Sequence, residues 1–296
     1  MNYESINLDL QSVMKRAYQN LLYRSSFMNF LNTSYLGDVR ATGTPKIEIV
    51  KQKATTLNVA KGAPVRTEAL SPNLTKYDPA SVDLTDLRID YSFRVPSLIT
   101  ATNISGIIDG QIEVNDSEVA MEVDKYGYGK LKTAITGNAD GSEAFTKGQV
   151  FVWAPSAKEE YISNINTLKA TLFNRKIYDN YLLGLEALEY ANYVSALTSV
   201  LKYETLSGVE AVDRGEVASA FGVSSFEINS NALNDVNVKG FFANEVGTVG
   251  DAFFSQFNEF AGNYPGFPGD YVVEGAILFG ADVVRPEAII KLVATA

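Results

Sequence analysis

The spacing of apolar and polar residues divides the chain into helical and extended segments. Between Leu10 and Leu22 the apolar residues fall three or four positions apart, which predicts a helix with one apolar stripe, and Asp9 is suited to cap its start. This stripe packs either on its own domain or, as an arm, on a neighbouring copy of the chain. Between Leu87 and Val95 apolar and polar residues alternate, which predicts a half-buried strand.

The longest predicted helix runs from Asn115 to Ile135. Acidic residues crowd its first turn and lysines lie near its end, an arrangement that the helix dipole favours. Its apolar residues recur every four positions from Val119. Gly127 and Gly129 interrupt the pattern, at a cost of about 1 kcal/mol each in a helix interior. They therefore mark either a bend or a place where another segment approaches closely.

The second half of the sequence mixes helices and strands. A helix begins at Ser156, where Ser156 and Glu159 have the spacing of a capping box after Pro155. The pattern then predicts a strand over 176–183, a helix over 186–201, an aromatic and apolar segment over 253–260, and an apolar strand over 271–279.

The segment from Thr44 to Tyr77 differs from the rest in charge. It contains six basic residues and two acidic ones, a formal charge of +4 in a chain whose total is −10, so the remaining residues sum to −14. An alternating strand begins at Lys46, a turn lies near Gly62, and residues 65–70 are a weak return strand. Too few large apolar residues are present for a separate core. We therefore expect a long hairpin that lies on an acidic surface, for which the rest of this protein qualifies.

The amino-acid composition excludes more classes of function than any motif does. The 296 residues include no Cys and no His, which excludes disulfides, thiolate nucleophiles, imidazole bases and Cys or His metal ligands. The hydrophobic fraction of 46% is large enough for a sizeable core. The negative net charge disfavours binding to nucleic-acid phosphates. The start of the chain does not have the pattern of a signal peptide and no apolar run approaches a membrane span, so we expect a soluble, intracellular product.

Residues that could act in catalysis or bind a metal ion or a phosphate are scattered along the sequence. Glu118, Glu122 and Asp124 share part of one predicted helix, and this pattern is typical of a solvated helix face. The acidic residues around Asp86 have neither the glycine turn nor the terminal Glu of a calcium loop. The glycine pairs near Gly127 do not have the spacing of a phosphate-binding loop. The sequence predicts no catalytic, cofactor or metal-binding residue.

Two stretches resemble the major capsid proteins of tailed phages. One runs from Pro265 to Ile289 and contains a Gly269-Asp270 turn, a strand that ends at Gly280, and the segment Val284-Arg285-Pro286-Glu287-Ala288-Ile289. The other, Glu118-Val119-Ala120-Met121-Glu122-Val123-Asp124, is similar to the start of that family's spine helix. The order of the predicted elements over nearly the whole chain also resembles this family.

The resemblance implies an α+β fold of the Hong Kong 97-type phage capsid family, which encapsulin shells share. Its parts would be an N-terminal arm over 1–42, an extended β-hairpin loop over 43–78, a peripheral domain over 79–175 with the spine helix at 115–135, an axial domain over 176–270, and a closing strand and C-terminal segment over 271–296.

The resemblance also implies a structural role without enzyme activity or cofactor. The protein would assemble with itself into hexamers and pentamers, forming the icosahedral head of a tailed phage. The head would enclose double-stranded DNA without sequence-specific binding, with a separate scaffolding protein and a portal as partners. The location would be the virion, with assembly in the host cytoplasm and no membrane. The residues expected at subunit interfaces are Lys46, Lys51, Lys53, Lys61, Arg66, Glu118, Glu122, Asp124 and Arg285.

Three alternatives stay open at the level of sequence. An encapsulin-like compartment shares the fold, but would need an inner apolar groove for its cargo. A His-free enzyme would need two or three carboxylates converging on one cleft. A tail-tube or decoration protein fits the long helix and the chain length less well.

Overall fold

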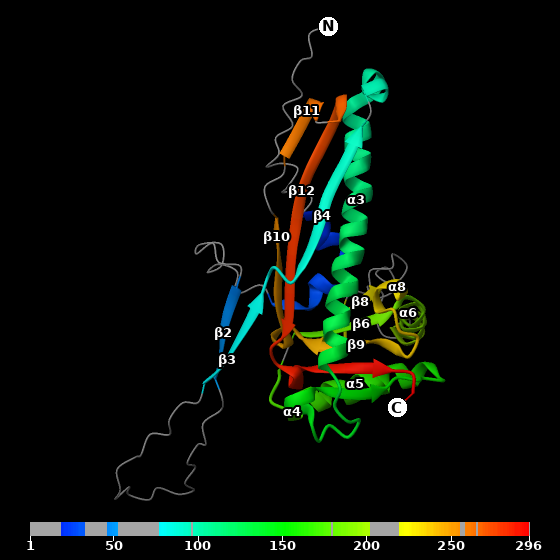
Figure 1. Ribbon diagram of the computed structural model, residues 1–296. Helices are drawn as coiled ribbons and strands as arrows, with labels where there is room; N and C mark the ends of the chain where they lie inside the picture. Colours follow the sequence, from blue (N-terminus) through cyan, green and yellow to red (C-terminus); the bar gives the residue numbers. More distant parts are fainter. Residues whose placement is uncertain are drawn as a thin grey trace, which may run out of the picture.

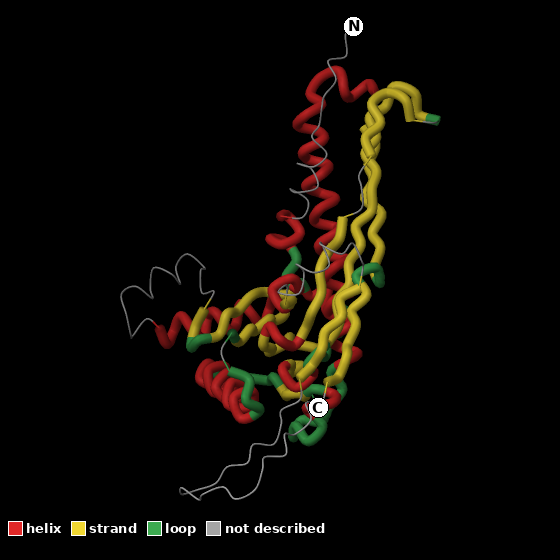
Figure 2. Tube along the Cα trace, turned by 90° about the vertical axis from the view of Figure 1, so that its left-hand side faces the viewer, coloured by secondary structure: helices red, strands yellow, loops and turns green. Residues whose placement is uncertain are grey.

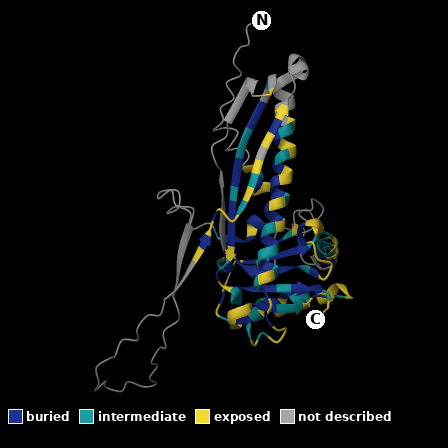
Figure 3. Cartoon of the chain, viewed as in Figure 1, coloured by how far each residue is buried: buried dark blue, intermediate teal, exposed yellow. Residues whose placement is uncertain are grey.

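The computed structural model describes residues 19–32, 46–52, 77–95, 97–178, 180–201, 219–254, 258–264 and 266–295. They form two main β-sheets, a two-stranded hairpin and one long helix (Figure 1). The buried residues (dark blue in Figure 3) form two clusters. One lies between the long helix and both sheets, and the other lies between the six-stranded sheet and two shorter helices.

The first sheet is built around the 17-residue strand β12, Phe267–Val283. Antiparallel neighbours flank β12: β4 on one side, and β10 and then β11 on the other. The short β1 pairs parallel with β10. The strands of this sheet are β1 (Leu31–Asn32), β4 (Leu87–Val95), β10 (Thr248–Phe254), β11 (Asn258–Tyr264) and β12.

The helix α3, Ser97–Ala134, runs along this sheet (Figures 1 and 2). At 1.5 Å per residue its 38 residues extend about 57 Å, and at about 3.3 Å per residue β12 extends about 56 Å. The two elements therefore match in length. Alternate residues of β12, among them Val273 and Ile277, are buried in the same core as Val123 and Leu131 of α3.

The six-stranded sheet has the order β5-β13-β9-β6-β8-β7 and is covered by α5 and α6. Parallel pairs join β13 to β5 and β6 to β8, while β9 is antiparallel to both β13 and β6. Its strands and helices are β5 (Gln149–Val152), α5 (Lys158–Asn174), β6 (Tyr181–Glu186), α6 (Ala187–Leu201), β7 (Ser219–Ala220), β8 (Val223–Ile228), β9 (Val238–Asn244) and β13 (Ile289–Val293).

Short helices connect these elements, and a separate hairpin precedes β4. The short helices are η1 (Phe27–Phe30), α4 (Ala144–Lys147), α8 (Ser230–Leu233), η2 (Glu245–Gly247) and η3 (Pro286–Ala288). The hairpin pairs β2, Lys46–Gln52, antiparallel with β3, Tyr77–Asp83. The predicted return strand over 65–70 lies outside the described residues.

Several sequence predictions are confirmed and several are wrong. The strand Leu87–Val95 has the predicted bounds, and the described end of the first predicted helix is helical over 19–24. The long helix begins at Ser97 instead of Asn115. The stretch before Asn115 is rich in β-branched residues and glycine, which have low helix propensity, so no local pattern indicates it. The predicted strand over 176–183 lies a few residues too early.

The sheets group the chain differently from the predicted domain boundaries. Helix α5 was expected with the peripheral part but covers the six-stranded sheet. Strands β10 and β11 were expected with the axial part but belong to the long sheet. Both differences have the same origin: contacts between residues far apart in the sequence leave no trace in local residue patterns. The domain boundaries themselves stay a prediction.

Candidate assembly site

Residues 19–32 are fastened to α3 by the carboxylate of Asp124, whose side chain is only 4% exposed. One oxygen, Oδ1, accepts hydrogen bonds from Ser25 Oγ at 2.5 Å and the Phe27 backbone N–H at 3.0 Å. The other oxygen, Oδ2, accepts from the Ser26 backbone N–H at 3.1 Å and Ser26 Oγ at 2.8 Å. Burial raises the pKa of Asp124, and these hydrogen bonds oppose the rise.

A third hydroxyl extends this network. Ser26 Oγ lies 2.8 Å from the Tyr128 hydroxyl. Since the single proton of Ser26 Oγ is donated to Asp124, the Tyr128 hydroxyl is the donor to Ser26. The ring of Tyr128 is fully buried, and burial holds the pKa of its hydroxyl well above the usual value.

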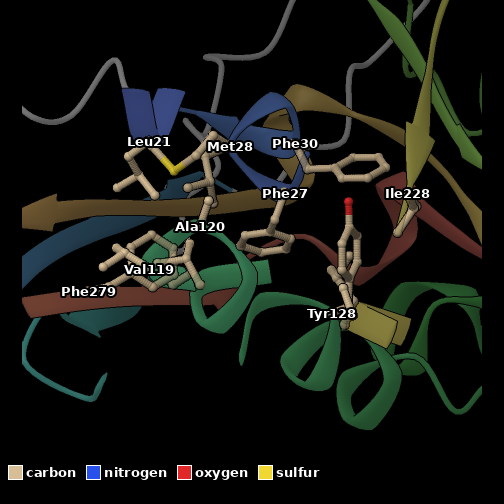
Figure 4. Close-up of a cluster of buried hydrophobic side chains, with 14 of the residues drawn as sticks. Leu21, Phe27, Met28, Phe30, Val119, Ala120, Tyr128, Ile228 and Phe279 are labelled. Atoms are coloured by element: carbon tan, nitrogen blue, oxygen red, sulfur yellow. The ribbon is translucent and has the colours of Figure 1, made fainter. Parts of the chain in front are cut away.

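Aromatic rings complete the junction between residues 19–32 and α3 (Figure 4). Phe27 and Phe30 both meet Tyr128 of α3 edge to face, with ring centroids 5.3 and 6.3 Å apart. Phe30 also meets Phe226 of β8 in the same way at 4.9 Å. Phe27 lies directly over Gly127: a Cβ at that position would be 2.2 Å from the ring atom Cδ1. Of the two alternatives that the sequence left open for the glycines of this helix, a bend or a close approach, Gly127 is therefore a place of close approach, whereas a Cβ at Gly129 would meet nothing within 4 Å.

Polar contacts continue along α3 toward its N-terminal half. Arg24 binds Glu113 at 2.8 Å and donates to Ser117, and Asn20 donates to the buried Asp116 at 2.7 Å. The segment is therefore held to α3 between Glu113 and Tyr128, which is about four turns of the helix.

The hairpin is anchored where β3 turns into β4. Leu84 in that turn is buried, and the Asp83 carboxylate accepts hydrogen bonds from the backbone and hydroxyl of Thr85. Strand β12 passes so close that a Cβ on Gly280 would lie 1.9 Å from the Asp83 carbonyl oxygen. Gly280, which lies in the C-terminal stretch that resembles phage capsid proteins, therefore allows this close contact.

A second cluster joins the same turn to α3. Asp86 forms an ion pair with Lys130 at 2.6 Å and accepts a hydrogen bond from the Tyr126 hydroxyl. The Lys130 ammonium lies 5.3 Å from the centre of the Tyr126 ring. The hydrogen bond from Lys130 lowers the pKa of Asp86, and burial, followed by the bond to Asp86, raises the pKa of Tyr126 to about 12.

The predicted interface residues are distributed over separate parts of the structure. Lys46 and Lys51 lie on β2, in register with Asp83 and Asp78 of β3. Glu118 and Glu122 are exposed on α3, and Glu122 pairs with Lys125 at 2.6 Å. Arg285 pairs with Glu287 at 2.9 Å. The remaining loop residues Lys53, Lys61 and Arg66 lie outside the described residues.

Asp124 is the one interface prediction whose surroundings argue against it. Its carboxylate faces the protein's own core, and both oxygens are occupied within the chain. It lies two residues beyond Glu122, which is about 200° around the helix, so the two carboxylates point in nearly opposite directions. The acidic pattern on this helix is therefore part surface and part core.

The described residues contain no group of three or more acidic side chains able to hold a metal ion. No helix among them is long and apolar enough to cross a membrane. An open hollow of about 390 Å³ beside Asp124 is lined by Arg24, Glu227, Asn229 and Ser230, among others. Its mixed charges favour no single class of ligand.

Large apolar side chains are exposed near α4 and α5 and in residues 19–32. Phe173 in the last turn of α5 and Tyr178 just after that helix are 59% and 54% exposed and meet edge to face at 5.0 Å. Phe145 on α4 is 70% exposed and Tyr23 is 90% exposed. Exposed aromatic side chains of this kind are typical of surfaces that other chains cover.

Comparison with known proteins gives structural matches only. No protein-family model and no curated protein matches the sequence. A structure from Mycobacterium phage Che8 is 16% identical, covers 90% of each chain and has a TM-score of 0.63. The capsid structure of the cyanophage P-SCSP1u is 12% identical over 85% of this chain and 83% of that one, with a TM-score of 0.57. The mature capsid of bacteriophage PhiM1 is also 12% identical, over 84% and 82%, with a TM-score of 0.55. The predicted α+β architecture is confirmed: this chain has the fold of tailed-phage capsid proteins.

Proposed function

We propose that this protein is the major capsid protein of a tailed phage, which assembles with itself into an icosahedral head around double-stranded DNA. The observation that carries the proposal is the match to phage structures over 84–90% of this chain, among them the capsids of the cyanophage P-SCSP1u and of bacteriophage PhiM1. A fold alone does not determine function, so the proposal also rests on the features of the site.

The features of the site support a structural role. In the described part of the chain no three acidic residues gather at one place to hold a metal ion, and several acidic residues form separate ion pairs. The exposed aromatic residues are suited to contacts between copies. In this proposal the long sheet with α3 is the peripheral domain, and the six-stranded sheet with α5 and α6 is the axial domain. A scaffolding protein and a portal would assist assembly in the host cytoplasm.

The proposed contact between copies joins the basic hairpin of one to the acidic outer face of α3 on another. The hairpin would supply Lys46, Lys51, Lys53, Lys61 and Arg66. Glu118 and Glu122 would receive them, and Arg285 would take part at a neighbouring contact. A single exposed ion pair contributes little, but repetition over many copies would set the registry of the lattice.

Electron microscopy of the purified protein, after size-exclusion chromatography, tests the proposal. We expect closed icosahedral particles, or rings of five and six subunits, alone or with a co-expressed scaffolding protein. Nuclease-resistant DNA in particles from phage-producing cells would support genome enclosure. A protein that stays monomeric or dimeric under all these conditions would overturn the proposal, and closed particles without DNA would contradict the genome-enclosing part.

Charge reversal tests the contact between copies. Glu118→Lys should reduce particle yield, and combining it with Lys51→Glu should restore part of that yield if the two surfaces meet. Lys158→Glu, at an exposed position on α5 outside the proposed contact, is the matched control and should assemble normally. Equal yields from Glu118→Lys and the control would argue against this contact.

A further inference from the structure

The direction in which the hairpin leaves the body is set at one short turn. Strand β3 ends at Asp83 and β4 begins at Leu87, so only three residues separate the hairpin from the long sheet. In Figure 1 the hairpin extends to the side of the body from the beginning of β4. A rotation of the backbone within this turn would therefore swing the whole hairpin relative to the long sheet.

Two contacts hold this turn, and they differ in kind. The first is steric: buried Leu84 and the close passage of Gly280 fix the position of the turn against β12. The second is polar: Asp86, at the end of the turn, reaches Lys130 and Tyr126 on α3. The steric contact fixes where the turn lies, whereas the polar contact links its far side to the helix.

The α3 side of the polar contact is itself rigid. The Tyr126 ring packs edge to face on Phe279 of β12, with ring centroids 5.7 Å apart, and Phe279 is fully buried. The Lys130 ammonium lies over the same ring. Asp86 is thus fastened to a helix position that the core already holds.

We propose that Asp86, Tyr126 and Lys130 form a positioning clamp that sets the angle of the β2–β3 hairpin relative to α3, and through it the curvature of the assembled shell. The effect on the shell rests on the proposed function; the effect on the angle does not. Asp86 and Lys130 are 47% and 39% exposed, and half-exposed ion pairs contribute little to stability. The contribution of this cluster is therefore to geometry more than to folding.

The natural absence of cysteine allows the angle to be measured directly. Cysteines introduced by Ser81→Cys on β3 and Thr133→Cys on α3, both exposed positions, would carry spin labels in the unassembled full-length protein. Pulsed electron paramagnetic resonance then gives the distance distribution between hairpin and helix. We expect a single narrow population with the clamp intact, and a shifted or broadened one in Asp86→Asn and in Lys130→Met.

The matched control is a neighbouring ion pair of the same kind. Arg88 and Asp90 on β4 are 2.9 Å apart, and their side chains are 67% and 72% exposed. Asp90→Asn should leave the distance distribution unchanged. The double variant Asp86→Asn/Lys130→Met should shift no further than either single variant, because both changes remove one contact.

The outcomes separate the clamp from simple stabilisation and from the proposed function. A lowered melting temperature with an unchanged distance distribution in both clamp variants would overturn the proposal. A changed distribution with particles of unaltered diameter would overturn the link to curvature. If the wild-type protein forms no particles, the distance measurement still decides the clamp, since it needs no assembly.

Discussion

Two glycines of α3, two positions apart, should respond oppositely to the same substitution. A Cβ added at Gly127 would lie 2.2 to 2.4 Å from three ring atoms of Phe27, whereas ordinary contacts are 3.4 to 4 Å. A Cβ added at Gly129 would meet nothing within 4 Å. Gly→Ala in a helix interior gains about 1 kcal/mol from propensity. Gly129→Ala should therefore stabilise the protein by about that amount.

At Gly127 the clash exceeds the gain. The Phe27 ring is 1% exposed and is bounded by Tyr128 and Phe279, with ring centroids 5.3 and 6.3 Å away, so it has little room to move. Overpacking a core costs about 1–3 kcal/mol and sometimes more. Since the ring must shift by roughly 1 Å or more to restore ordinary contact, the upper part of that range applies. After subtraction of the propensity gain, Gly127→Ala should destabilise by about 2 kcal/mol.

Urea unfolding of both variants as unassembled protein measures the difference. Circular dichroism reports the helices, and fluorescence of the single buried Trp153 reports the six-stranded part. Hydrogen exchange of peptides covering 19–32 should accelerate in Gly127→Ala only. If the two variants are equally stable, the packing of Phe27 on α3 described above is incorrect.

Four further outcomes are expected. Gly280→Ala places a Cβ against the backbone of Asp83, which cannot yield as a side chain does, so we expect a loss of more than about 3 kcal/mol, measured by urea unfolding. Asp124→Asn keeps the shape of the side chain but turns an amide N–H₂ toward N–H and O–H donors, so the free energy of unfolding should fall by about 2 kcal/mol in the same assay. An unchanged urea midpoint would mean that water accepts the hydrogen bonds from these donors. Since the pKa of Tyr126 rises from about 10 to about 12 on folding, stability should fall between those pH values, and Tyr126→Phe should make that fall shallower. Backbone N–H groups lower the pKa of Glu160 below 4.5. The contribution of this carboxylate to the stability of the fold is therefore present above pH 4.5 and is lost as the pH falls through the lowered pKa. Glu160→Gln should flatten acid unfolding curves.

Local patterns predicted the elements whose exposure alternates along the chain. Strand β4 was found with its bounds because one face packs on α3 and the other faces solvent, which imposes the alternation. The start of α5 was placed near its true position, but the capping carboxylate is Glu160 and not Glu159, since the helix begins at Lys158. An error of one position in a helix start changes which side chain reaches back to cap it.

The candidate site could be predicted only in part. For Gly127 the sequence leaves a bend and a close approach as alternatives, and nothing local identifies Phe27, about a hundred residues earlier, as the group that approaches. The same holds for the clamp: Asp86 appeared in the sequence only as one of several scattered acids. Contacts over such separations depend on the chain having already folded, so they become visible only in three dimensions.

Asp124 shows why an acidic pattern on a helix does not define a surface. The bound serines and backbone N–H groups replace water around the carboxylate, and they all come from residues 25–27. A buried carboxylate without such donors would be strongly unfavourable. The sequence Ser25-Ser26-Phe27 therefore contributes to the junction in two ways. The serine hydroxyls donate hydrogen bonds to the Asp124 carboxylate, and the Phe27 ring fills the space over Gly127. Ser25→Ala and Ser26→Ala should each weaken this junction and should be less than additive with Asp124→Asn, because all three changes remove parts of one network. Full additivity in a double-mutant cycle would refute that coupling.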